Sequence, residues 1–467
     1  MFGSKKPVAE TEAEPYTQNV DPLAEIPKTR WERIWPAMAC GSGLFSDGYI
    51  NNVIGSVSTI LKKLYGKAYT ESGAQKNISA ITFAGTVFGM LIFGYTSDKW
   101  SRSNSLLLST VILIIFAALG SGAYGGGSLQ GMFAALTAYR FLVGIGIGGE
   151  YPAGSVACSE ATGELRAGSR NRWFILFTNV MIDWGFVIGA FVPYFDNHLR
   201  AVWRISLGLG VVPPLVLLWL RLKLKEPEEF KKESMKNAKI PYGLVLKYYG
   251  PRLFVVSLIW FIYDFSTYSF GIFSSTILSN ILPSTASLAQ SFGWNTVINL
   301  FYIPGAMLGS LFSDFVGPRY ALVIGVTLQG LVGFLMAGLY PTLAKPGNVG
   351  GFAVVYGIFL SLGELGPGDN IGLLASKTCA TGVRGQYYAI AAAVGKIGAF
   401  VGTYIFPAII AFWFIPQIGQ DTITLEDIRF REYLEKNGWD TRQLGLGKGE
   451  VESLGERKVE EKETVKE

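Results

Sequence analysis

Long apolar stretches recur along the whole chain, and they constrain its fold more than any other feature. Roughly 20 apolar residues suffice for a helix to cross a bilayer, and we place about eleven such stretches. Only 16% of the residues are charged, against about 25% in typical soluble domains. The sequence therefore predicts an all-α polytopic membrane protein. The expected spans are 35–60, 78–97, 104–124, 131–158, 173–195, 201–222, 252–282, 293–313, 320–340, 350–375 and 387–415.

The basic residues gather in short segments between the apolar stretches. This pattern is typical of cytoplasmic loops and accounts for the net charge of +5 without a nucleic-acid partner. Lys99, Arg102 and the basic segment 223–250 all fall inside if the N-terminus is cytoplasmic, although Lys62 and Lys63 in the first outer loop go against the rule. We expect an integral protein of the plasma membrane with a cytoplasmic N-terminus, the lipid bilayer being one of its partners.

Two pairs of similar segments indicate an internal duplication. "GYTSDKWSRS" (94–103) follows the second span and "SLFSDFVGPR" (310–319) follows the eighth. "GGEYPAG" (148–154) and "LGELGPG" (362–368) recur at nearly the same offset. Two similar halves joined by a charged loop resemble the duplicated architecture of major facilitator transporters, with two six-helix halves. The expected parts are a cytoplasmic tail (1–33), an N-terminal transmembrane half (34–222), a central cytoplasmic loop (223–250), a C-terminal transmembrane half (251–416) and a charged tail (417–467).

The same repeat predicts that one C-terminal helix is missing. The sixth span, 201–222, should recur near 417–438, but that segment reads "QIGQDTITLEDIRFREYLEKNG" and is too polar to cross a membrane. We expect the join near Ile410–Ala411. With about eleven spans, the charged tail would lie on the opposite side from the N-terminus.

Several ionisable residues lie near the middle of their spans. Such residues usually face the bundle interior and mark a substrate or proton path, and the site of a two-halved transporter is expected at the midplane. These residues are Asp47, Glu150, Asp183, Asp264, Glu364 and Lys396. Asp183 and Glu364 are secondary candidates, together with Asp369 and with Arg140, which lies nearer the outer end of its span.

The stretch "WFIYDFSTY" (260–268) places three polar or aromatic side chains on one helix face. Trp260, Asp264 and Tyr268 are spaced i, i+4, i+8. Lys396 is the sole midplane cation and favours an anionic ligand such as a phosphate or a carboxylate. A purely structural ion pair between Asp264 and Lys396 is the alternative interpretation, and core packing alone would also explain Trp260 or Tyr268.

Uphill import of an anion needs a driving ion, for which a proton is the economical choice. Buried carboxylates can take up and release protons near neutral pH. The sole histidine, His198, lies in an outer loop, so Asp47 and Glu150 are the better candidates. Sodium coupling stays open as an alternative.

Other motifs predict structure and no chemistry. Asp98 and Arg102 in "SDKWSR" are spaced i, i+4 and are expected to pair or to cap neighbouring helix ends. With Gly94, and with Asp314 in the second copy, they form a candidate gating motif. "GIGIGGE" (144–150) predicts close helix packing inside an apolar span. We find no nucleophile–base pair, metal set or phosphate loop, so we expect no enzyme, no metal and no cofactor.

Further motifs carry a specific resemblance. "RFLVGIGIGGEYPAGS" (140–155), "WFIYDFSTY" and "VGKIGA" (394–399) resemble the phosphate:proton symporter family. Within it, the chain is most similar to the fungal glycerophosphodiester permeases of the glycerophosphoinositol type. The segments that carry this similarity are "SDGYIN" (46–51), "GIFSSTI" (271–277), "GPGDNIGLLAS" (366–376) and "YLEKNGW" (433–439).

The resemblance implies roles for particular residues. It implies that a phosphate group is surrounded by Trp260, Asp264, Tyr268, Tyr151 and Lys396. It also implies that Asp47 and Glu150 belong to a proton pathway. Our own hypothesis is that Asp264 binds the phosphate when protonated and then passes that proton on. The family usually has aspartate where Glu150 stands, and its members have a twelfth span.

We therefore expect a monomeric, proton-coupled importer of glycerophosphodiesters, such as glycerophosphoinositol or glycerophosphocholine, that works by alternating access. Its partners would be a small organophosphate, protons and the bilayer. Three alternatives stay open: an inorganic phosphate:proton symporter, a nutrient sensor that binds without transporting, and an inactive product that lacks a helix.

Overall fold

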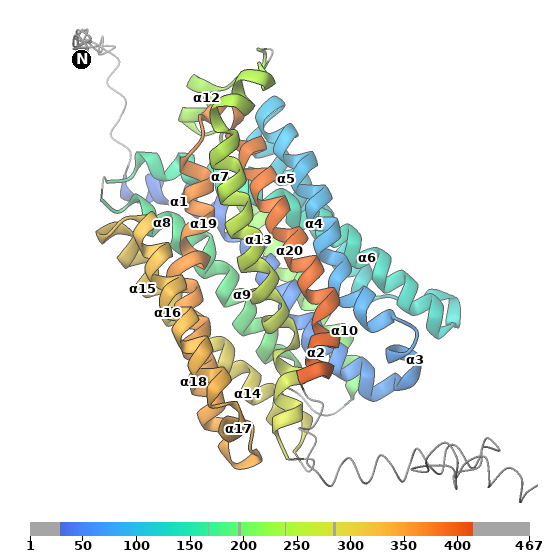
Figure 1. Ribbon diagram of the computed structural model, residues 1–467. Coiled ribbons are helices and arrows are strands. Elements are labelled where there is room, and N and C mark those ends of the chain that lie inside the picture. Colours follow the sequence, from blue (N-terminus) through green and yellow to red (C-terminus); the bar gives the residue numbers. More distant parts are fainter. Residues whose placement is uncertain (1–28, 167, 195–197, 239, 284–285, 414–467) are drawn as a thin grey trace, which may run out of the picture. The chain divides into compact units, whose positions relative to one another are not determined.

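The computed structural model describes residues 29–166, 168–194, 198–238, 240–283 and 286–413, and within these ranges it contains helices and no strands. The chain divides into two units, Met1–Phe406 and Pro407–Glu467, and the helical bundle belongs to the first (Figure 1). The predicted charged tail, 417–467, and the segment 417–438 that corresponds to the sixth span lie outside the described residues.

Ten helical segments of the described residues are long and apolar enough to cross a membrane. They agree with ten of the predicted spans and confirm an all-helical membrane protein. They are Ala74–Lys99, Arg102–Gly127, Leu129–Glu164, Arg170–Tyr194, Leu199–Arg221, Tyr242–Leu278, Leu288–Phe315, Pro318–Gly338, Val349–Lys377 and Thr381–Ile405.

The remaining predicted span, 35–60, is the first in the chain and is helical but less apolar than the others. It corresponds to α1, a short 3₁₀ turn and α2, which follow one another from Arg30 to Tyr65. Most side chains of α2 are buried within the bundle, including those of Asp47, Asn51 and Asn52. A helix surrounded by protein can carry polar residues that a lipid-facing helix cannot, which explains why its hydropathy is lower.

The helices appear in the following order. They are α1 (Arg30–Gly41), α2 (Phe45–Tyr65), α3 (Lys67–Thr70), α4 (Ala74–Lys99), α5 (Arg102–Ser121), α6 (Leu129–Gly149), α7 (Val156–Ala161), α8 (Arg170–Phe177), α9 (Asn179–Phe191), α10 (Leu199–Gly208), α11 (Val212–Arg221), α12 (Glu228–Glu233), α13 (Tyr242–Ile281), α14 (Leu288–Leu300), α15 (Tyr302–Phe315), α16 (Pro318–Gly338), α17 (Tyr340–Leu343), α18 (Val349–Gly363), α19 (Asp369–Lys377) and α20 (Arg384–Trp413).

The predicted duplication is visible in two widened helical turns. The π-helical turns Glu150–Ser155 and Glu364–Gly368 interrupt equivalent helices of the two halves, and they coincide with the repeated motifs. Each turn contains a proline, which cannot supply a backbone N–H to the preceding turn. Such widened turns are frequent at functional sites, and here they begin with glutamates at matching positions.

Glycines bring α4 and α6 into direct backbone contact. A Cβ added to Gly144 would lie 2.2 Å from the Thr82 carbonyl oxygen, and one added to Gly148 would lie 2.4 Å from that of Thr86. "GIGIGGE" therefore serves helix packing, as the sequence predicts.

We expect Gly144→Ala to lower the free energy of unfolding by about 1–3 kcal/mol, because the added methyl group must push the two helices apart. Gly330→Ala on α16 is the matched control, since nothing lies within 4 Å of a Cβ at that position. Denaturant titration of both variants in detergent measures the difference. Equal stabilities would contradict the packing argument.

The long helix α13 connects the two halves at the centre of the bundle. It begins at Tyr242, within the segment that the sequence assigns to the central loop, and it continues through Pro251 to Ile281. Figure 1 shows α13 beside α20, and a Cβ on Gly398 would lie 2.3 Å from the Phe261 carbonyl oxygen. α13 also packs against α2 of the first half.

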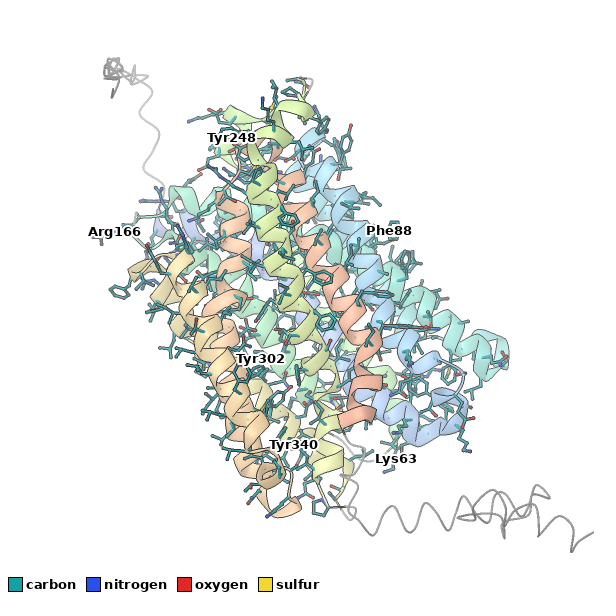
Figure 2. All side chains as sticks on the ribbon, in the orientation of Figure 1. Lys63, Phe88, Arg166, Tyr248, Tyr302 and Tyr340 are labelled. Carbon is teal, nitrogen blue, oxygen red and sulfur yellow. The ribbon has the colours of Figure 1, made fainter. Side chains whose placement is uncertain are left out.

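Large apolar side chains cover the outer face of the bundle. Phe88, Phe254 and Phe334 are all exposed, whereas Tyr302 is buried (Figure 2). An extended exposed apolar surface is what contact with lipid requires.

Candidate substrate site

A narrow cavity of about 60 Å³ lies between the two halves. All five residues that the resemblance assigns to a phosphate group line it: Tyr151, Trp260, Asp264, Tyr268 and Lys396. Asp183, Glu364 and Asp369 line it as well, whereas Arg140 does not. A space of this size holds on the order of a few water molecules. The empty space at the centre of the bundle is therefore small.

Lys396 of α20 is buried at the centre of the site and is shared between two acids. Its Nζ lies 3.4 Å from Asp264 Oδ2 and 3.5 Å from Asp47 Oδ2. It also contacts the hydroxyl of Tyr268 and lies over the rings of Tyr268 and Tyr151, at 3.7 and 5.0 Å from the ring centroids. One lysine between two carboxylates leaves the group with one negative charge when all three are ionised. Both ion pairs are longer than a charge-assisted hydrogen bond of about 2.7–2.9 Å.

Asp47 links this lysine site to the first half of the chain. Its Oδ2 accepts hydrogen bonds from the hydroxyls of Tyr151 and, at 2.8 Å, Tyr268. Its Oδ1 accepts one at 2.6 Å from the side-chain amide of Asn51. By contrast, Asp264 Oδ2 makes the 3.4 Å ion pair with Lys396 and, among the described residues, accepts no hydrogen bond. Asp264 is therefore the acid that an incoming ligand can engage with the least loss of existing contacts.

The predicted stripe on α13 is confirmed, because Trp260, Asp264 and Tyr268 all face the cavity. The indole of Trp260 packs on α20 at Gly395, where a Cβ would lie 2.5 Å from its Cδ1 atom. Its ring centroid is 5.5 Å from that of Tyr388. These contacts hold the indole against the cavity wall.

A second group of acids lines the same cavity. The side-chain amide of Asn179 donates 2.8 Å hydrogen bonds to Glu364 Oε2 and Asp369 Oδ1, and the hydroxyl of Tyr263 donates a 3.0 Å bond to Glu364 Oε1. Asp183 of α9 lies within electrostatic reach of both acids. We call Asp183, Glu364 and Asp369 the acidic cluster. The sequence placed these acids at one depth but did not identify Asn179 or Tyr263 as their partners.

The structure does not bring Glu150 to this cavity. Its two carboxylate oxygens pair with the Arg221 guanidinium at 2.6 and 2.7 Å. Arg221 also donates to Thr110 Oγ1 and to the carbonyl oxygen of Ala39. A bidentate pair of this kind fixes the position and orientation of the carboxylate. In the sequence, Arg221 lies at the end of the sixth predicted span, next to the basic loop 223–250. The sequence therefore does not indicate that Arg221 is buried.

Arg140, which the sequence places nearer the outer end of its span, is also buried. Its Nε donates a 2.7 Å hydrogen bond to the carbonyl oxygen of Ile78, and its Nη1 donates a 3.4 Å bond to that of Ile50. The guanidinium therefore ties α6 to α4 and α2.

Arg102 forms a buried ionic network at one end of the bundle. It donates to Asp98 Oδ1 at 2.7 Å and to both oxygens of Glu160 at 2.9 and 3.0 Å. It also donates to the Thr381 carbonyl oxygen of the second half at 3.2 Å and lies 4.4 Å from the centroid of the Phe230 ring. The predicted Asp98–Arg102 pair is thus confirmed, within a larger network.

Asp98 also caps a helix of the opposite half, as the sequence predicts. Its carboxylate accepts hydrogen bonds from the backbone N–H groups of Gly385, at 3.0 Å, and Gln386, at 2.8 Å, in the first turn of α20. Helix N-termini favour such negative charges. Gly94 allows the approach, because a Cβ there would lie 2.3 Å from that of Ala389.

The second copy of the motif makes the reciprocal contact. Asp314 accepts two hydrogen bonds from Arg172 near the start of α8, one from the backbone N–H at 3.3 Å and one from the side-chain Nε at 3.2 Å. Each motif aspartate thus docks on a helix start in the opposite half. We call the contacts of Asp98, Arg102, Glu160 and Asp314 the motif latch.

Contacts between α2 and α13 close the other side of the cavity. A Cβ on Gly55 would lie 2.2 Å from the Ile272 carbonyl oxygen. The hydroxyls of Thr59 and Ser275 are 3.3 Å apart. The two halves therefore touch on both sides of Lys396 and Asp264.

A duplicated helical bundle with a polar cavity between its halves is the architecture of many membrane transporters. The chain belongs to the sugar (and other) transporter family, whose model matches residues 35–230 and 225–413. Its fold is that of a major facilitator superfamily proton:xylose symporter, with a TM-score of 0.68 and 18% identity over 82% of this chain and 90% of that one.

Curated relatives are similar over most of the chain. A glycerophosphocholine permease of Candida albicans is 49% identical, covering 90% of this chain and 85% of the relative. The major glycerophosphoinositol permease of the same organism is 47% identical, covering 95% and 89%. An inorganic phosphate transporter of rice, Oryza sativa subsp. japonica, is 25% identical, covering 83% and 86%. The resemblance drawn from the motifs is thereby confirmed.

Proposed function

We propose that this transporter imports glycerophosphodiesters together with protons, by alternating access in the plasma membrane. The observation that carries the proposal is the buried Lys396, shared between Asp47 of the first half and Asp264 of the second. A cation held by acids from both halves can respond to an anionic ligand and to proton uptake at the same point. The names of the relatives support the class of substrate.

The phosphodiester is proposed to dock at Lys396. The lysine supplies charge attraction, and Trp260 and Tyr268 supply N–H and O–H donors beside it. Asp264 would repel a phosphate when ionised, whereas its protonated form would donate a hydrogen bond. Binding of the anion and protonation of Asp264 therefore favour each other, and that mutual preference is the physical basis of the proposed coupling.

Asp47 is the second proton-binding candidate. It contacts Tyr151, Tyr268 and Lys396, so a change in its charge reaches the ligand site through direct contacts. The ion pair with Arg221 makes Glu150 a weaker candidate, because neutralising Glu150 would leave the arginine buried without a counter-ion. We propose a structural role for Glu150, as the link between the widened turn and α11.

The closed cavity fits an occluded state of a transport cycle. We propose that the cytoplasmic side opens when the motif latch breaks, and that the outer side opens when contacts such as Thr59–Ser275 break. Each set joins the two halves, so rocking of one half against the other breaks one set and keeps the other.

Uptake of radiolabelled glycerophosphocholine and glycerophosphoinositol, in cells that lack their own permeases, tests the proposal. We expect faster uptake at pH 5 than at pH 7.5, because the substrate-binding form carries the proton. Asp264→Asn, which mimics the protonated acid, should retain binding and lose most of this pH dependence. Unchanged pH dependence in the variant would remove Asp264 from the coupling mechanism.

Inorganic phosphate is the alternative substrate, because the lysine end of the cavity would fit either ligand and a rice relative carries that name. Uptake of labelled inorganic phosphate distinguishes the two. Phosphate uptake, with no uptake of the diesters, would favour phosphate.

A further inference from the structure

The lining of the cavity contains two groups of side chains, which we call its two ends. Lys396 contacts Asp264 and Tyr268 in one group, and the acidic cluster of Asp183, Glu364 and Asp369, with its partners Asn179 and Tyr263, forms the other. We propose that the acidic cluster binds a cationic headgroup, so that the transporter selects glycerophosphodiesters with a quaternary ammonium group over those with an uncharged polyol. This inference rests on the proposed function, because it requires the phosphodiester to be held at Lys396.

Asp183 is the main observation behind this inference. Its side chain is completely buried and faces the cavity, and neither carboxylate oxygen has a hydrogen-bond partner. Asp369 Oδ2 also lacks one. A buried carboxylate without a partner is costly, and a positively charged ligand would supply what these oxygens lack.

The surrounding protein does not neutralise the cluster. None of the ion pairs found in the described part of the chain includes Asp183, Glu364 or Asp369. The groups that contact the cluster are neutral donors, the amide of Asn179 and the hydroxyl of Tyr263. Three carboxyl groups beside neutral donors thus lie at this end of the cavity without an ion-pair partner among the described residues.

The geometry of α13 places the two ends within reach of one small molecule. Asp264 and Tyr263 are neighbours in sequence, and their side chains point about 100° apart around the helix. Asp264 faces Lys396, whereas Tyr263 bonds Glu364 of the cluster. Asp264 and Glu364 are also within electrostatic reach of each other. In glycerophosphocholine the ammonium group is only two carbons beyond the phosphate ester oxygen, a separation suited to adjacent ends.

The chemistry around the cluster favours an organic cation over a metal ion. Among the described residues, no group of three or more acidic, cysteine or histidine side chains is arranged to hold a metal. Phe174, Phe186 and Tyr263 line the cavity together with Asp183. Aromatic faces beside carboxylates are suited to a quaternary ammonium group, which cannot donate hydrogen bonds and is attracted to π-systems.

The proposed headgroup preference is tested first by competition on the unmodified chain. Labelled glycerophosphocholine is the substrate, and unlabelled glycerophosphocholine or glycerophosphoinositol is the competitor. We expect glycerophosphocholine to compete at roughly tenfold or more lower concentration, given the strength of desolvated cation–π and charged contacts. Equal potency, or the reverse order, would overturn the inference and leave the proposed function intact. Absence of uptake of either diester, despite surface expression, would instead contradict the proposed function.

Asp183→Asn and Glu364→Gln test the cluster itself, with the exposed Glu71→Gln as the matched control. We expect each cluster variant to raise the KM for glycerophosphocholine roughly tenfold and to change that for glycerophosphoinositol by no more than about twofold. The ratio of the two KM values is independent of expression level. An equal change for both substrates would overturn the inference, because a proton-binding or structural role affects every substrate alike.

Discussion

Replacing Lys396 by methionine should reduce uptake on the order of 100-fold or more. The change removes the cation that the substrate phosphate would meet, and it leaves Asp47 and Asp264 facing each other without a counter-ion. A hydrogen bond to a charged group contributes about 1.5–3 kcal/mol, and each 1.4 kcal/mol corresponds to about a factor of ten. The two uncompensated acids would also repel the phosphate. Methionine keeps the length and apolar stem of the side chain, so the effect reports the charge.

Uptake and surface expression should be measured together for this variant. Lys63→Met is the matched control, since Lys63 is exposed near one end of the bundle (Figure 2), and we expect it to be neutral. A second variant, Lys396→Met combined with Asp47→Asn, separates folding from transport. It removes one of the uncompensated acids and should recover stability without recovering uptake. Substantial uptake by Lys396→Met would show that the shared lysine is a structural element only.

Arg102→Ala should destabilise the protein by about 3–5 kcal/mol, since it leaves Asp98 buried without a counter-ion and leaves Glu160 with Arg384 alone. It should also shift the transporter towards the state that is open at the motif latch. The exposed pair of Lys231 and Glu228 offers the contrast. We expect Lys231→Ala to cost less than about 1 kcal/mol. Denaturant titration in detergent compares the free energies of unfolding of Arg102→Ala and Lys231→Ala.

Cys379 is a native cysteine whose labelling can report whether the motif latch is open. It lies two residues before Thr381, whose carbonyl accepts a hydrogen bond from Arg102. Burial raises the pKa of the Cys379 thiol to about 12, so little of the reactive thiolate is present near neutral pH. We expect slow maleimide labelling in the wild type and markedly faster labelling in Arg102→Ala, with Cys379→Ala identifying the labelled site. Unchanged labelling would contradict the role of the latch in opening.

Residues within one helix were the most predictable part of the site. The spacing of Trp260, Asp264 and Tyr268 fixes their common face, and the spacing of Asp98 and Arg102 fixes their pairing. Both follow from helix geometry alone.

Contacts between helices were less predictable, because they depend on how each helix is rotated. Asp47 and Glu150 read alike in the sequence, as single acids in apolar spans. The structure turns Asp47 towards Lys396 and Glu150 towards Arg221, which lies 71 residues further along the chain. Arg221 ends a span and therefore resembles an ordinary loop cation. No local pattern distinguishes such a partner from its neighbours in the basic segment.

The acidic cluster illustrates the same point for the ligand. The sequence places Asp183 and Glu364 at one depth in separate spans, but it does not show that they share a cavity with Lys396. Nor does it show that Asp183 lacks hydrogen-bond partners. The electrostatic polarity of the site, from which the headgroup preference is inferred, requires the packed bundle.

The most direct test uses the purified full chain in liposomes, with labelled glycerophosphocholine outside and an imposed inward proton gradient. The account predicts that substrate accumulates inside above its external concentration, that a protonophore abolishes the accumulation, and that Lys396→Met shows none. Equal internal and external concentrations, unaffected by the protonophore, would contradict proton coupling. Binding of the substrate without any entry would contradict transport itself.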